Sequence, residues 1–118
     1  MRALLPAAVA SLMTATAPAM ADSMTVKMLY DHCSSDETFR MSYCMGVMYG
    51  VADTMKLAGA DAVVRRTIPR VVMCRADPVT AEAEAQAFKN WALRSPKLWD
   101  KPGSYGVIVA MSSTWPCD

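Results

Sequence analysis

The chain has 118 residues, of which 12 are Lys or Arg and 11 are Asp or Glu, so its net charge at pH 7 is +1. A chain of this length forms a single domain. Nucleic acids and charged membranes normally select proteins with a basic excess, so the balanced charge argues against both as the main partner. With one histidine, no glycine-rich phosphate loop and no Cys-x-x-Cys pair, few parts of an enzyme are present. We expect no catalytic residue, no metal and no cofactor.

The first 21 residues have the layout of a secretory signal peptide. Arg2 precedes an apolar, alanine-rich run, and the segment ends in the small-x-small sequence Ala19-Met20-Ala21. We therefore expect cleavage after Ala21, which leaves a domain over 22–118 with 97 residues, 11 basic and 11 acidic. No later segment is long and apolar enough to cross a bilayer. We expect an exported protein with no membrane contact after cleavage.

Four cysteines lie in the expected mature domain: Cys33, Cys44, Cys74 and Cys117. Their even number and exported context predict disulfide bonds, for which three pairings are possible. A structural metal site normally needs clustered ligands, whereas no two of these cysteines are closer than 11 positions. Methionines together with His32 are an alternative site, because thioethers suit copper(I). We favour the interpretation that methionines at helical spacing fill a core or a dimer face.

The expected mature domain begins with a short helix over 24–33 and a longer helix over 37–57. In the longer helix an apolar row recurs at steps of three and four residues and predicts a buried face: Met41, Cys44, Met48, Val51 and Met55. Gly59 is placed to stop this helix.

A second row on the same helix consists of small residues. Gly46 and Gly50 are four positions apart, and glycine weakens a helix relative to alanine, so their presence predicts that another helix packs closely there. Asp53 follows on this helix, where it either stays solvated or pairs with a basic residue such as Arg65 or Arg66. We interpret Gly46, Gly50 and Asp53 as a helix-packing motif.

The middle of the chain predicts two further helices. The first spans 60–68 and ends at Pro69, because proline disfavours helical backbone in the residue before it. Asp77-Pro78 marks a turn. Thr80 then caps a helix over 81–93, since a threonine hydroxyl can accept a hydrogen bond from a free amide of the first turn.

A connector over 97–102 leads to the last helix, 104–113, with Ser104 as its cap and Val107, Ile108 and Met111 pointing inward. The β-branched run within it is equally typical of a strand on propensity alone, and the helical context decides for a helix. The sequence therefore predicts an all-α fold, a small disulfide-stapled bundle of four to five helices.

The string Cys44-Met-Gly46-Val-Met-Tyr-Gly50-Val-Ala-Asp53 resembles the C-x-G-Y-[IV]-x-G-V-x-D-A signature of the Rap1a/Tai family of immunity proteins. Other landmarks of the family follow in order: Cys33 upstream, Cys74 before Pro78-Val79-Thr80, and the closing Trp115-Pro116-Cys117. Val47 and Thr54 depart from the tyrosine and alanine of the signature. The resemblance covers essentially the whole expected mature domain.

The resemblance implies a compact, mostly helical, disulfide-containing periplasmic protein that is often a homodimer. Characterised members bind and block peptidoglycan amidase effectors delivered by type VI secretion. We therefore expect a periplasmic protein that inhibits a cell-wall amidase by occluding its active site, which requires shape and a few anchors rather than catalysis. The alternative is a general periplasmic helical protein with a structural or chaperone-like stress role and no toxin partner.

Candidate contact residues follow from residue type and expected loops. Arg65, Arg66 and Arg70 lie in the irregular segment 60–78, and Trp99 lies in the connector. For the disulfides we expect one bond between the first two helices, Cys33–Cys44, and one between the middle segment and the C-terminus, Cys74–Cys117. The nested and crossed pairings stay open.

Overall fold

The structure of the chain, a computed structural model, describes residues 24–74 and 79–117. These residues form five α-helices and two 3₁₀ helices: α1 (Val26–Cys33), α2 (Thr38–Ala60), α3 (Ala62–Thr67), η1 (Pro69–Val71), α4 (Ala81–Arg94), η2 (Pro96–Leu98) and α5 (Gly103–Thr114). The described part contains no strand, only an isolated bridge between Thr25 and Pro102, and the all-α prediction is confirmed. The expected signal peptide, 1–21, and the expected turn at Asp77-Pro78 lie outside the described residues. Within the described ranges, no helix has the length and apolar character of a membrane span.

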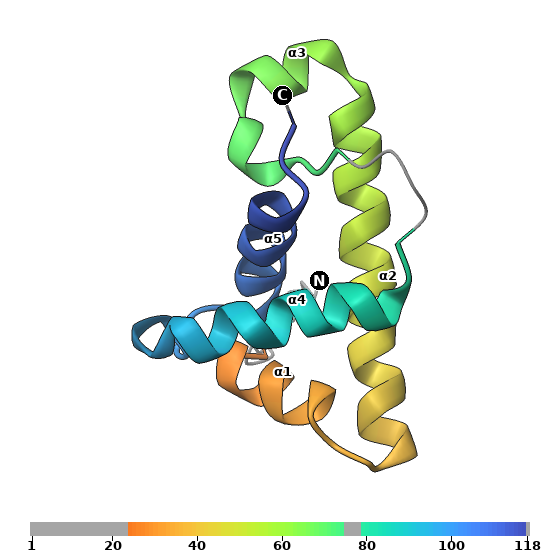
Figure 1. Cartoon of the computed structure of the whole chain (residues 1–118), viewed down its shortest axis with the longest axis vertical. Coiled ribbons are helices and arrows are strands. Elements are labelled where there is room, and N and C mark those ends of the chain that lie inside the picture. The colour runs from red at the N-terminus through yellow and green to blue at the C-terminus, as the bar shows by residue number, and fades with distance from the viewer. Residues whose placement is uncertain (1–23, 75–78, 118) are drawn as a thin grey trace, which may run out of the picture.

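The long helix α2 forms the axis along which the other helices are arranged (Figure 1). α4 crosses α2, α5 runs alongside its upper part, and α1 lies below α4, so that these four helices enclose one core. The core side chains are aliphatic, sulfur-containing or aromatic: Val26, Leu29, Cys33, Cys44, Met48, Ala52, Met55, Met73, Ala81, Ala85, Phe88, Trp91, Ala92, Val107, Ala110 and Met111. α3 and η1 lie at the end of α2 that is opposite α1, beyond this core.

Threonine caps determine where two of these helices begin. The Thr80 hydroxyl accepts a hydrogen bond from the Ala83 amide at 3.2 Å, as predicted, and Thr25 caps α1 in the same way. α5 differs from the prediction: it begins at Gly103, one residue before the expected cap Ser104, and no side chain caps it.

The glycines of α2 do not have the roles that the sequence predicts. α2 continues to Ala60, so the expectation that Gly59 stops the helix is wrong. Gly59 is buried, and a Cβ atom there would lie 2.7 Å from the backbone oxygen of Met73, so the missing side chain lets the two backbones approach. The close packing expected at Gly46 and Gly50 is wrong within one chain, because both are exposed and a Cβ at either would meet nothing within 4 Å.

α5 is a helix despite its β-branched residues. Gly106 brings it against α1 and α4, since a Cβ at this position would lie 2.7 Å from the Trp91 ring and 2.9 Å from Val26. Of the three side chains expected to point inward, two are buried and Ile108 is only half-buried.

Both disulfides connect the expected cysteines. Cys33–Cys44 joins the end of α1 to α2, and Cys74–Cys117 joins the segment after η1 to the C-terminal end. The first lies in the core, with both residues at most 1% exposed, whereas both cysteines of the second are half-buried.

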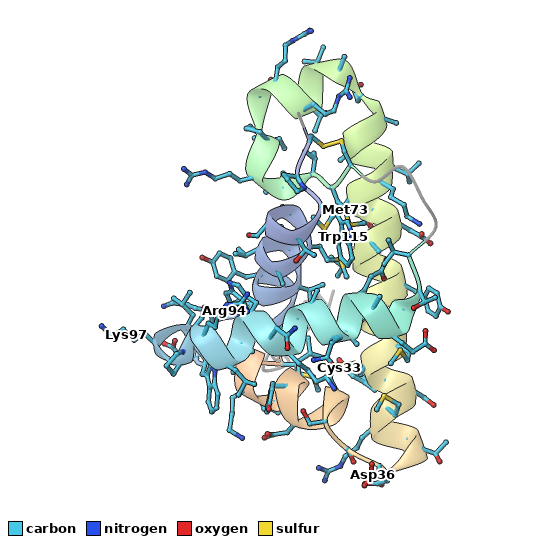
Figure 2. All side chains as sticks on the ribbon, in the orientation of Figure 1. Cys33, Asp36, Met73, Arg94, Lys97 and Trp115 are labelled. Carbon is cyan, nitrogen blue, oxygen red and sulfur yellow. A yellow bond between two sulfur atoms is a disulfide. The ribbon has the colours of Figure 1, made fainter. Side chains whose placement is uncertain are left out.

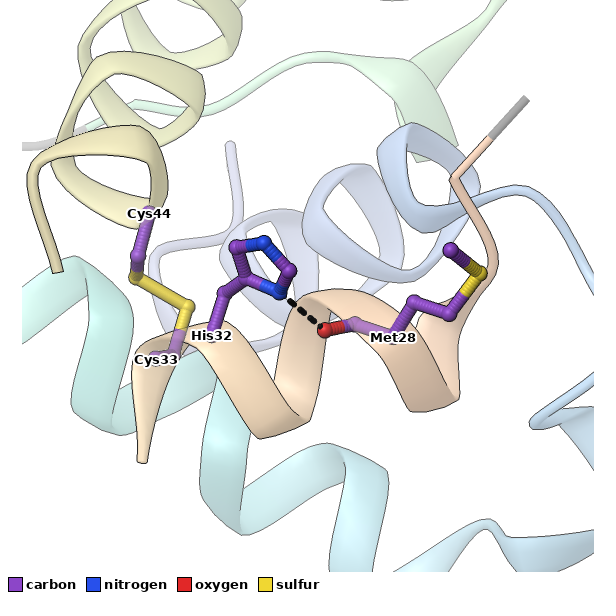
Figure 3. The surroundings of a disulfide bond; sticks show 4 residues. All are labelled: Met28, His32, Cys33 and Cys44. Carbon is purple, nitrogen blue, oxygen red and sulfur yellow. Dashed lines mark hydrogen bonds between the residues drawn. A yellow bond between two sulfur atoms is a disulfide. The ribbon is translucent and has the colours of Figure 1, made fainter. Parts of the chain in front are cut away.

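His32, next to the buried disulfide, has a packing role. Its Nδ1 donates a hydrogen bond to the Met28 carbonyl at 2.9 Å, and the Met28 side chain points away from the ring (Figure 3). The ring also lies against Tyr43, at a centroid distance of 5.3 Å. In the part of the chain that the structure describes, no group of three or more His, Cys, Asp or Glu side chains is arranged to hold a metal.

Candidate partner-binding surface

A short helical segment, residues 61–71, lies beyond the core and is called the tip segment below. It comprises α3 and η1 and lies at the end of the molecule opposite α1 (Figure 1). Asp61 organises its start, because the carboxylate accepts hydrogen bonds from the amides of Val63 (2.8 Å) and Val64 (2.9 Å). No residue of α3 or η1 is buried, so burial of its own side chains does not hold the segment in place.

The residues that follow the tip segment anchor it. Val72 and Met73 are buried, at 0% and 2% exposure. The Cys74 amide donates a hydrogen bond to the Trp115 carbonyl at 3.0 Å, and the disulfide from Cys74 to Cys117 makes the same connection covalently. Figure 2 labels Met73 and Trp115, where these two parts of the chain meet. The tip segment is therefore held by the residues that follow it, with Met73 in the core and Cys74 bonded to the C-terminal end, rather than by burial of its own side chains.

Three arginines dominate the charge of the tip segment. Arg65, Arg66 and Arg70 are all exposed, and no ion pair found within the described residues includes any of them. Asp61 is the only acidic residue of the segment and is used as a cap. Three apolar side chains are exposed among the arginines: Val63, Ile68 and Val71. Arginine beside exposed apolar side chains is typical of protein–protein interfaces.

A groove of about 610 Å³ lies between η1 and α5. η1 contributes Arg70 and its two neighbours, and α5 contributes mainly apolar side chains: Tyr105, Ile108 and Val109. Arg70 was predicted from the sequence as a contact residue, whereas the α5 side of the groove was not. The signal was present, because α5 is apolar around most of its circumference, whereas a surface helix needs only one apolar face.

Trp99, the remaining contact candidate, lies on another arm of the molecule. It follows η2, near the position where Figure 2 labels Lys97, and the structure does not bring it together with the arginines. Its indole Nε1 donates to the Ala92 carbonyl at 2.7 Å, and its ring stacks on Tyr30 at a centroid distance of 5.9 Å. Its carbonyl accepts from the Lys27 amide at 3.1 Å. These contacts fix the connector to α1 and α4, so we leave Trp99 out of the candidate surface.

Asp53 is exposed and forms an ion pair with Lys56, one helical turn away, at 2.9 Å. Asp53 therefore pairs with a basic residue, as one of the two expected alternatives had it, but with Lys56 rather than with Arg65 or Arg66. Exposed pairs of this kind contribute about 0–1 kcal/mol to the free energy of unfolding, so this pair is not a major support of the fold.

The chain is similar to a known protein family. A family model described as Rap1a immunity proteins matches residues 25–117. The matched range includes both disulfides, the tip segment and the helical core. No curated protein and no solved structure matches the chain significantly.

Proposed function

The chain belongs to the Rap1a immunity protein family, and on that premise we propose that it is a periplasmic immunity protein that inhibits a peptidoglycan amidase effector by occluding its active site. In this proposal the protein acts by binding and carries out no catalysis. The effector contacts the tip segment and the groove beside it.

The observation that carries the proposal is the set of three exposed arginines without a described ion-pair partner: Arg65, Arg66 and Arg70. Arginine is among the residues that contribute most to binding energy in interfaces. The anchors at Met73 and Cys74 hold the tip segment in place before binding, which reduces the conformational entropy that binding costs. A tip of this kind can fill the mouth of a cleft.

The groove supports the same surface. Its volume of about 610 Å³ and its apolar α5 wall provide a recess for an effector side chain directly beside Arg70. Guanidinium groups form their strongest hydrogen bonds with carboxylates. We therefore expect acidic residues at the rim of the effector's active site.

The two disulfides support an exported location, because disulfides persist in oxidising compartments such as the periplasm. Export by a signal peptide that is cleaved after Ala21 is part of the proposal, and N-terminal sequencing of periplasmic protein tests it. A homodimer, which the family resemblance implies, is also part of the proposal.

The test is to look for a peptidoglycan amidase encoded beside this gene and to measure its inhibition. The purified chain should block peptidoglycan hydrolysis by that amidase, and periplasmic co-expression should rescue cells from lysis. The double variant R65E/R70E should raise the dissociation constant by about 100-fold, because it places two acidic groups where the effector binds arginine. The matched control K97E reverses an exposed charge on the η2 arm. It should change the dissociation constant by less than about threefold.

Failure to bind any neighbouring amidase would contradict the proposal. Suppression of client aggregation at low pH, without selective amidase binding, would instead favour the general periplasmic role. Equal effects of R65E/R70E and K97E would contradict the assignment of the tip segment as the contact surface.

A further inference from the structure

α2 presents apolar or small residues on two opposite sides. One side faces the core: Cys44, Met48, Ala52, Met55 and Gly59. A second row follows the opposite side at steps of three, four and seven residues: Phe39, Tyr43, Gly46, Gly50 and Leu57. These steps return to the same side of a helix with 3.6 residues per turn. A helix that is apolar on two sides normally has packing partners on both.

The second row is open to solvent. The exposed fractions of Phe39 and Leu57 are 73% and 77%, and a Cβ at Gly46 or Gly50 would meet nothing within 4 Å. Single exposed apolar residues are ordinary, but this row extends over about 27 Å of one helix. At its centre the two glycines have no side chain and open space around them, which permits close approach of another helix.

Four of the five residues in this row are placed symmetrically about the level of Met48, which itself faces the core. Phe39 and Leu57 are each nine residues from Met48, and Gly46 and Gly50 are each two residues from it. An antiparallel copy of α2, related by a two-fold axis at this level, would place each Phe39 opposite the second copy's Leu57 and each Gly46 opposite the second copy's Gly50. Isologous interfaces require this kind of self-complementarity.

Tyr43 of the row and Asp53, which lies beside the row on α2, also favour the antiparallel arrangement. Tyr43 and Asp53 are each five residues from Met48, so the arrangement brings the Tyr43 hydroxyl of one copy level with the Asp53 carboxylate of the other. A parallel pairing would instead bring two Asp53 carboxylates level with each other. Tyr43 is 41% exposed while its ring lies against His32, so its accessible part borders the row.

We propose that a second copy of this chain binds to this face, with α2 packed antiparallel on α2 and Gly46 and Gly50 at the centre. The inference deepens the homodimer part of the proposed function, and it involves a surface other than the tip segment. One helix from each copy forms an interface at the small end of the specific range. The dimer should therefore be weak, with a dissociation constant on the order of 10 µM.

Sedimentation velocity of the mature chain over about 1 µM to about 1 mM should show a monomer–dimer equilibrium. F39E and L57K should each raise the dissociation constant by at least about tenfold, because each buries a charge against an apolar residue. The double variant F39E/L57K should return to within about threefold of the unmodified chain, since opposite charges then meet in the antiparallel register. The control L93E changes an apolar residue of α4 that is 58% exposed and should have no effect.

A chain that stays monomeric throughout the range would overturn the inference. So would single variants that leave the dimer unchanged. Single variants that abolish dimerisation without recovery in F39E/L57K would overturn the antiparallel register. These measurements use no effector, so their failure is distinguishable from failure of the amidase test.

G46L provides a second readout. A leucine at this position has open space in the monomer, so the melting temperature should not fall, while the side chain should block the close approach of the two copies. We expect the dissociation constant to rise by at least about tenfold. An unchanged dimer would contradict the contact at the glycines.

Discussion

Around Cys33–Cys44 the protein is a packed core, whereas around Cys74–Cys117 it consists of short segments with little buried surface. Four helices contribute fully buried side chains such as Phe88 and Leu29 to the first region. α3 and η1 contribute none, and the second region depends on Val72, Met73 and a half-buried disulfide.

This difference shows how a small domain can combine stability with a binding surface. Burial of apolar side chains stabilises the helical core. The tip segment is instead held by a disulfide and by two buried residues that follow it. Its arginines and exposed apolar residues are therefore not needed for packing and are available to bind a partner. Substitutions of core residues in the first region should therefore lower stability, and substitutions of exposed residues in the tip segment should weaken binding.

The largest loss of stability should come from the core. Phe88→Ala removes a fully buried ring at the contact of α4 with α5 and should lower the free energy of unfolding by about 3–5 kcal/mol. The matched control Phe39→Ala removes a ring that is 73% exposed and should change it by less than about 0.5 kcal/mol in dilute protein. Urea denaturation followed by circular dichroism measures both. Similar losses in the two variants would contradict the assignment of the core.

Removal of the second disulfide should have the next largest effect. The double variant C74S/C117S opens a loop of 43 residues and should lower the free energy of unfolding by about 2–4 kcal/mol, mainly because the unfolded chain gains freedom. Limited proteolysis should then cut first within residues 61–73. Cleavage that begins instead in α4 would show that the disulfide supports the core rather than the tip segment.

Gly59→Ala tests the junction between the two regions. Its Cβ would lie 2.7 Å from the Met73 backbone oxygen, so the backbone after η1 must shift. We expect a loss of about 1–2 kcal/mol after the better helix propensity of alanine is included. The Tm of thermal unfolding and the affinity for the effector should both decrease. An unchanged Tm would contradict the close approach.

Gly46→Ala should have the smallest effect and the opposite sign. The position is helical and has open space around it, so alanine should raise the free energy of unfolding by about 0.5–1 kcal/mol at concentrations where the chain is monomeric. Calorimetry of Gly46→Ala and Gly59→Ala under the same conditions compares the two positions directly. A loss of stability in Gly46→Ala would reveal a contact that α2 makes within one chain.

The fold could be predicted from the sequence where local signals and periodicity agree. Thr80 caps α4 as expected, and most of the predicted apolar row of α2 is buried, with Cys44, Met48 and Met55 in the core. The two disulfides connect the expected cysteines. Caps act on amides a few residues away, and helical periodicity is local, so a single sequence contains this information.

The errors concern contacts between residues far apart in the chain. Gly59 resembles a helix stop, and only the position of Met73 explains why it lies inside the helix instead. Gly46 and Gly50 have the same spacing as a packing motif, yet no helix within residues 24–74 and 79–117 packs closely against them. Trp99 has the residue type of an interface anchor, but its hydrogen bond to Ala92 gives it a structural role. A residue's type and spacing cannot specify which of these environments it meets.

Hydrogen exchange on the chain with and without its amidase effector tests the central claim most directly. We predict that binding protects amides of the tip segment, residues 61–71, and of α5 beside the groove, because both would lose contact with water. Amides of the η2 connector, 96–101, should be unchanged. Protection confined to the connector or to α1, with the tip segment exchanging as in the free protein, would contradict the account.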